Sequence, residues 1–152
     1  MKKSLVVLGV GALVIIAASS AQQVHKSSTA AKKVATKKVV YMSSSEAAFK
    51  PAAAKGVSQT VVWGNPDKGP HGTYTKFEPG VDVGMHTHTN DVWIVGIKGA
   101  YLYKDDAGEK RVGPGDFLRV PGGHKHSSAG DKTEGALFYE EGSAKFDLIP
   151  VK

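Results

Sequence analysis

The carboxyl-terminal two thirds of the chain alternate between short apolar runs and turn residues. From Gly56 onward, β-branched and aromatic runs are separated by Gly, Pro, Asn and Asp at intervals of about ten residues. This pattern is typical of an all-β sandwich or barrel, because no segment carries a helical apolar period of useful length. It predicts ten strands, over residues 58–63, 72–77, 81–86, 91–97, 99–104, 109–112, 116–120, 124–128, 135–141 and 145–150.

Two clusters of turn residues support this interpretation. The segments 104–109 (KDDAGE) and 113–116 (GPGD) both predict tight turns between neighbouring strands. Glycine supplies 18 of the 152 residues, which exceeds the usual share of about 7%. The composition therefore favours a turn-rich β domain over a helix bundle.

The first 21 residues have the pattern of an export signal. Lys2 and Lys3 precede an apolar run from Leu5 to Ala18, and small residues follow up to Ala21. The alternative is an uncleaved membrane anchor, but a run of 14 residues is shorter than the roughly 20 needed to span a bilayer. The sequence predicts an exported protein, periplasmic or secreted, with no stable membrane span.

The remaining chain divides into a linker and one domain. Residues 22–55 are rich in Lys, Ala and Ser with few large apolar groups, which predicts a largely disordered linker; a partner-binding tail is the alternative. Residues 56–152 form the predicted β domain. The net charge of +6 comes from residues 1–55, with nine Lys and one Glu, whereas residues 56–152 carry eleven basic and thirteen acidic side chains. Nucleic-acid binding is therefore not expected of the domain.

Four of the six histidines fall into two closely spaced pairs. His86 and His88 form the first pair, and His124 and His126 form the second. Residues two apart in a strand point to the same face, so each pair offers two imidazoles at chelating distance. The chain contains no cysteine, which excludes thiolate metal sites and disulfides. Histidine nitrogens suit Zn, Fe, Cu, Ni and Mn, although two exposed histidines would give the same pattern.

The glycines around these pairs carry a family resemblance. His86 and His88 lie between Gly80 and Gly99, at spacings that match the first signature motif of the cupin superfamily. The second motif is matched by Gly115, Pro121, Gly123 and His126. The chain resembles small single-domain cupins, including uncharacterised ones and the zinc-binding cupin domain of anti-sigma factors. The resemblance implies a cupin double-stranded β-helix, or jelly-roll barrel, over residues 56–152.

The same resemblance implies a mononuclear metal site. It assigns His86, His88 and His126 as ligands of one divalent ion, with Fe or Zn expected and Mn, Ni or Cu as alternatives. Val92 stands where the family has a glutamate ligand, so the expected site has three histidines. Asp91 is an alternative fourth ligand if a bulge turns it inward; otherwise it is a surface or turn residue. The family motif gives His124 no ligand role.

The resemblance implies two classes of function and leaves both open. In the first, the protein is a metal-dependent dioxygenase that uses iron and acts on a small chelating or anionic molecule. In the second, it is a non-catalytic module that binds or senses zinc or a small ligand. Glu140 and Glu141 are expected to be surface charges, with a general base at the barrel mouth as the alternative. A small-molecule ligand and a homodimer are the partners that the resemblance implies.

Overall fold

The computed structural model describes residues 38–43 and 45–152, and within them every regular element is a β-strand. The predicted signal segment and the linker up to residue 37 lie outside the described residues. In the part that is described, no helix is long and apolar enough to cross a membrane. The strands are β1 (Lys50–Pro51), β2 (Val57–Gly64), β3 (His71–Phe77), β4 (Asp82–Thr87), β5 (Val92–Gly99), β6 (Tyr101–Asp105), β7 (Gly108–Val112), β8 (Phe117–Val120), β9 (His126–Gly130), β10 (Ala136–Gly142) and β11 (Ile149–Pro150).

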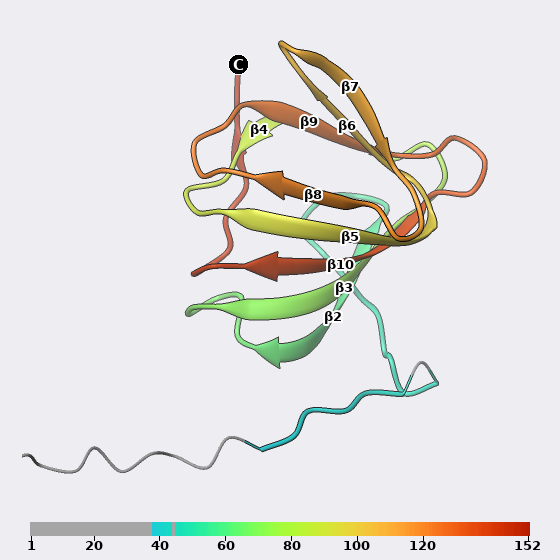
Figure 1. The fold of residues 1–152 in the computed structure, drawn as a ribbon, viewed down its shortest axis with the longest axis vertical. Coiled ribbons are helices and arrows are strands. Elements are labelled where there is room, and N and C mark those ends of the chain that lie inside the picture. The colour runs from blue at the N-terminus through green and yellow to red at the C-terminus, as the bar shows by residue number, and fades with distance from the viewer. Residues whose placement is uncertain (1–37, 44) are drawn as a thin grey trace, which may run out of the picture. The chain divides into compact units, whose positions relative to one another are not determined.

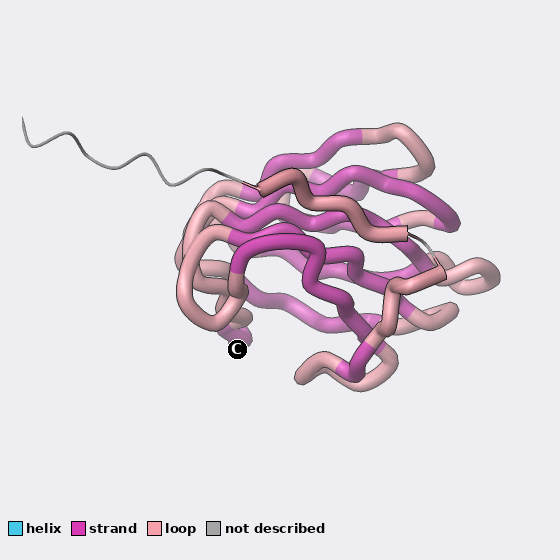
Figure 2. The backbone as a smooth tube through the Cα atoms, turned by 90° about the horizontal axis from the view of Figure 1, so that it is seen from below, coloured by secondary structure: helices cyan, strands magenta, loops and turns pink. Residues whose placement is uncertain are grey.

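These strands form two antiparallel sheets. The first has the order β1-β2-β3-β10-β5-β8, and the second has the order β11-β4-β9-β6-β7. In Figure 1 the first sheet runs upward from β2 to β8, and β9, β6 and β7 of the second lie at the top. Figure 2 shows that loops join the strands at both ends of the two sheets. The predicted all-β jelly roll is thereby confirmed.

Each of the ten predicted strands overlaps an observed one, and most boundaries agree within two residues. The last prediction is too long, because only Ile149–Pro150 is a strand and residues 145–148 are irregular. One strand was not predicted. Within the segment assigned to the linker, Lys50 and Pro51 pair with Gln59 and Ser58 of β2. The first sheet therefore begins before Gly56.

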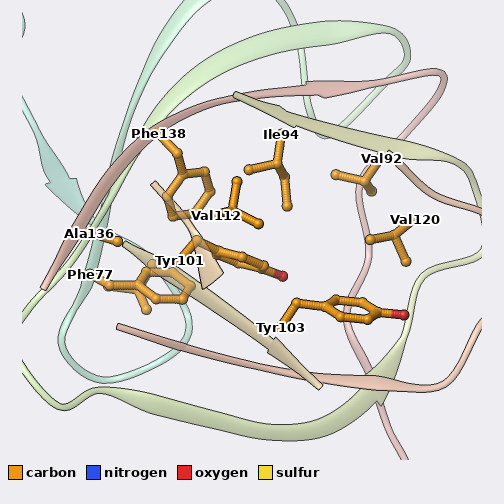
Figure 3. Close-up of a cluster of buried hydrophobic side chains, with 10 residues drawn as sticks. Phe77, Val92, Ile94, Tyr101, Tyr103, Val112, Val120, Ala136 and Phe138 are labelled. Atoms are coloured by element: carbon orange, nitrogen blue, oxygen red, sulfur yellow. The ribbon is translucent and has the colours of Figure 1, made fainter. Parts of the chain in front are cut away.

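Aromatic side chains from three strands form one end of the core. The ring of Phe138 on β10 lies 5.2 Å from that of Phe77 on β3 and 5.0 Å from that of Tyr101 on β6, measured between centroids. Figure 3 shows these rings against one another, with Val92, Ile94 and Val120 further along the interior. Because side chains alternate along a strand, β10 buries Ala136, Phe138, Glu140 and Gly142 in turn. This alternation directs a charged residue, Glu140, into the same interior.

Gly96 in β5 is required by a close approach of main chain. A Cβ atom at this position would lie 2.0 Å from the carbonyl oxygen of Gly113. We expect Gly96→Ala to lower the free energy of unfolding by about 1–3 kcal/mol, as overpacked interiors do. Urea denaturation measures the effect. Gly69→Ala is the control, because its added methyl group would meet no other atom within 4 Å, and equal losses in the two variants would contradict the prediction.

Candidate metal centre

Three histidines converge in the interior, and they are those that the resemblance implies as metal ligands. His86 on β4 lies directly across from His126 on β9 in the antiparallel register, and His88 follows just past the end of β4. One ring nitrogen from each residue lies within 4.8 Å of the other two. All three side chains are buried, with His126 fully inaccessible. Strand pairing thus gathers histidines from distant parts of the chain into one group.

Main-chain carbonyls fix the orientation of all three rings. The Nδ1 atoms of His86 and His126 lie 2.8 Å and 3.0 Å from the carbonyl oxygens of Gly84 and His124, and His88 Nδ1 lies 2.5 Å from the carbonyl of Asp147. A carbonyl oxygen can only accept, so each Nδ1 carries the proton and donates it. The lone pair is then on Nε2 of each ring, which is the tautomer that a metal ligand needs.

The protonation states also suit a metal. Burial lowers the pKa of His86 and of His88, and it lowers the pKa of His126 to about 4, with His86, His88 and His124 adding to the effect on His126. All three imidazoles are therefore neutral near pH 7. Nε2 of His126 is buried and has no hydrogen-bond partner among the described residues. A divalent ion of the borderline class would satisfy this nitrogen, so the donor set fits the metal that the resemblance implies.

A carboxyl-terminal segment completes the site, and the sequence did not indicate it. The carbonyl of Asp147 accepts a hydrogen bond from Nδ1 of His88, while its carboxylate accepts hydrogen bonds from the amide and the hydroxyl of Thr89. The ring of Phe146 lies 5.1 Å from that of His88. No local motif marks these residues, because their position follows from the path of the chain after β10.

Asp91, the alternative fourth ligand, is engaged elsewhere. Its Oδ2 accepts hydrogen bonds from Nη2 and Nε of Arg119 at 2.6 Å and 3.1 Å, and its Oδ1 accepts one from the Gly122 amide at 2.9 Å. The hydrogen bond from the Gly122 amide has the largest effect on the Asp91 carboxyl, followed by those from Arg119, and together they hold its pKa below the usual range. Val92 faces the interior, so the residue before it faces outward. The structure brings together the three histidines without Asp91.

His124 lies beside the site but outside the group of three. Its Nε2 lies 2.9 Å from Oδ2 of Asp105, which also accepts a 2.7 Å hydrogen bond from the Tyr103 hydroxyl. The hydrogen bond from Tyr103 has the larger effect and that from His124 the smaller, and they lower the pKa of Asp105 to about 2. The Tyr103 ring stacks on His126 at 5.4 Å between centroids. Tyr103 therefore packs against the candidate ligand His126, and Asp105 bonds both the Tyr103 hydroxyl and His124.

The three histidines open onto a cavity of about 250 Å³. Its walls are mainly apolar, but Glu140 also lines it and is buried, so the expectation of a surface charge at this position is wrong. The alternation along β10 was the signal that could have found it, since Phe138 and Glu140 must face the same side. Glu141 faces the other way and accepts a hydrogen bond from the Tyr139 hydroxyl.

A family model described as the ChrR Cupin-like domain matches residues 37–145. The chain belongs to this cupin family. No curated protein sequence matches the chain at a significant level. The family match and the fold agree with the resemblance found in the sequence, including its relation to the cupin domain of an anti-sigma factor.

Solved cupin structures share the fold at low sequence identity. The polyketide cyclase RemF from Streptomyces resistomycificus is 16% identical with a TM-score of 0.66, over 76% of this chain and 87% of that one. KdgF from Halomonas sp. is 20% identical with a TM-score of 0.56, over 68% and 93%. The anti-sigma factor ChrR, in complex with Rhodobacter sphaeroides SigE, is 16% identical with a TM-score of 0.53, over 66% of this chain and 51% of that one.

Proposed function

We propose that this cupin is an exported metal-dependent oxygenase, in which His86, His88 and His126 hold one iron ion. Its substrate is a small chelating or anionic molecule, and dioxygen is the co-substrate. Export rests on the amino-terminal sequence pattern alone. The observation that carries the catalytic part is the cavity, since the three histidines line a space large enough for a small molecule.

Ligand number supports a reactive site over a structural one. Structural zinc sites are closed by four protein ligands, whereas catalytic sites keep a position open. Among the described residues, the group that could hold a metal consists of three histidines. All three are neutral donors, so a divalent ion would keep its full charge and attract an anionic oxygen.

The protein's own residues supply binding and orientation. The carbonyls of Gly84, His124 and Asp147 hold the three Nε2 atoms toward one point, which lowers the cost of organising the site. The walls are mainly apolar, so the few polar groups that line the cavity would determine how a bound substrate is oriented. Iron bound there would supply the redox chemistry of oxygenation.

A second function is favoured by the family itself. Membership in the ChrR Cupin-like domain family, and the shared fold with an anti-sigma factor in complex with SigE, support a non-catalytic module that binds zinc and senses a ligand. In that case the cavity would hold an effector rather than a substrate.

Elemental analysis separates the two proposals. The full chain, purified without a His tag from its natural compartment, is expected to contain one iron per chain and to consume oxygen with a diketone, thiol or phenolic acid. One zinc per chain with no oxygen consumption would overturn the oxygenase in favour of the sensing module. Absence of any metal, including after incubation with Fe²⁺ or Zn²⁺, would overturn both.

A further inference from the structure

The cavity beside the histidines has a second polar feature, the side chain of Glu140. This residue is 7% exposed and lines the same cavity as His86, His88 and His126. Its Oε1 atom is buried and has no hydrogen-bond partner within the described part of the chain. A carboxylate in this position is costly to bury unless a donor reaches it.

The neighbouring polar side chains already have partners of their own. Opposite Glu140 in the register, Thr73 shares a 3.3 Å hydrogen bond with Thr75, and Gln59 donates a 3.1 Å hydrogen bond to the Thr75 hydroxyl. On the facing sheet, the hydroxyls of Tyr101 and Ser128 bond each other. No donor among the described residues lies within hydrogen-bond distance of Glu140 Oε1, which leaves a molecule in the cavity that Glu140 lines as a source of one.

The size and walls of the cavity limit what can enter it. A cavity of about 150 Å³ in another protein holds benzene, so about 250 Å³ accommodates one ring with substituents. The walls include Val57, Phe77, Val92, Ile94, Val120 and Leu148. Figure 3 shows Ile94 and Val120 among these side chains, and it shows the Tyr101 hydroxyl pointing away from the rings of Phe77 and Phe138. Such walls favour a flat apolar ring over a sugar or a peptide.

We propose that Glu140 determines specificity by accepting a hydrogen bond from a hydroxyl group of a single-ring ligand whose anionic oxygen faces the three histidines. The ligand class is a hydroxylated aromatic acid or a close equivalent. The placement of the anionic oxygen depends on the proposed metal site being correct, whereas the placement of the hydroxyl group depends only on Glu140. Burial raises the pKa of Glu140 to about 7, because the charged carboxylate is poorly solvated there. A hydrogen bond from a ligand hydroxyl would stabilise the carboxylate in place of protonation.

Binding of simple aromatic acids to the zinc-loaded full chain tests the proposal. Benzoate, 3-hydroxybenzoate and 4-hydroxybenzoate are titrated by isothermal calorimetry, and the zinc content of each sample is measured separately. At least one hydroxybenzoate is expected to bind about tenfold more tightly than benzoate, the advantage of a hydrogen bond to a charged group. In Glu140→Leu this preference should fall to within about twofold, while the affinity for benzoate is kept.

Two further variants make the result specific. Glu140→Gln retains an oxygen acceptor and should keep part of the preference, and Glu141→Gln, on the outward face of the same strand, should keep all of it. Equal binding of all three acids to the zinc-loaded chain, no binding of any of them, or an unchanged preference in Glu140→Leu would each overturn the inference. Failure to take up zinc would instead overturn the proposed metal site, since metal content is read independently of ligand binding.

Discussion

Replacement of His126 by alanine is expected to reduce the affinity for zinc or iron by more than about a hundredfold. Loss of a group that only orients a metal ligand already costs about 10–100-fold, and here a donor nitrogen itself is removed. Metal should also cease to stabilise the fold. At a free metal concentration a thousand times the dissociation constant, binding adds about 4 kcal/mol to the free energy of unfolding. Thermal denaturation with and without Zn²⁺ measures this difference.

Two variants control for effects on folding. His124→Ala removes a half-exposed imidazole two residues away that bonds Asp105, and Asp91→Asn alters the carboxylate that bonds Arg119. Both should keep one metal per chain and the full stabilisation by Zn²⁺. If His126→Ala retained wild-type affinity, or if His124→Ala lost the metal instead, the assignment of the ligands would be wrong.

Glu140→Gln is expected to abolish the part of the pH dependence of the free energy of unfolding that comes from the Glu140 carboxyl. In the unfolded chain this carboxyl loses its proton near its ordinary pKa of 4.5, whereas in the folded protein burial raises the pKa to about 7. Between these values the folded state binds more protons than the unfolded state, so the stability that this group contributes is complete below pH 4.5 and is lost as the pH rises through 7. The pKa shift corresponds to about 3 kcal/mol.

The measurement compares the metal-free wild-type protein with Glu140→Gln by urea denaturation at pH 4.5 and pH 8. Subtracting the two proteins cancels the titration of groups common to both, including the histidines. The wild type should lose about 3 kcal/mol more than the variant on going to pH 8, and Glu141→Gln should behave like the wild type. A difference between wild type and Glu140→Gln that does not change with pH would contradict the burial of a titrating carboxyl.

The strand pattern was predictable because it depends on short-range features of the sequence, whereas the grouping of the three histidines was implied by the resemblance to cupins. Alternating apolar residues and turn glycines define strands locally, but no local pattern shows that His86, His88 and His126 meet. For Glu140, a charged residue after Phe138 suggested the surface, although strict alternation along β10 directs it inward. The expectation that a charged residue lies on the surface was wrong here, because the alternation of side chains along the strand determines which face Glu140 occupies.

Other parts of the site depend on long-range geometry that no local pattern encodes. Asp147 and Phe146 reach His88 because the chain returns across the barrel after β10, and β1 joins the sheet through only two residue pairs. Similarly, the outward direction of Asp91 was ambiguous in the sequence because a bulge would have reversed it. These features required the three-dimensional path of the chain.

The carbonyls that orient the histidines differ in how far away they are along the chain. Gly84 and His124 are each two residues before the histidine they bind, so the orientation of His86 and of His126 depends on local main chain. The partner of His88 is Asp147, 59 residues later. A contact that closes so long a loop carries an entropic cost that a contact between residues two apart does not. The orientation of His88 therefore depends on docking of the segment around Asp147, so a change that loosens this segment would disturb one of the three rings and leave the other two held.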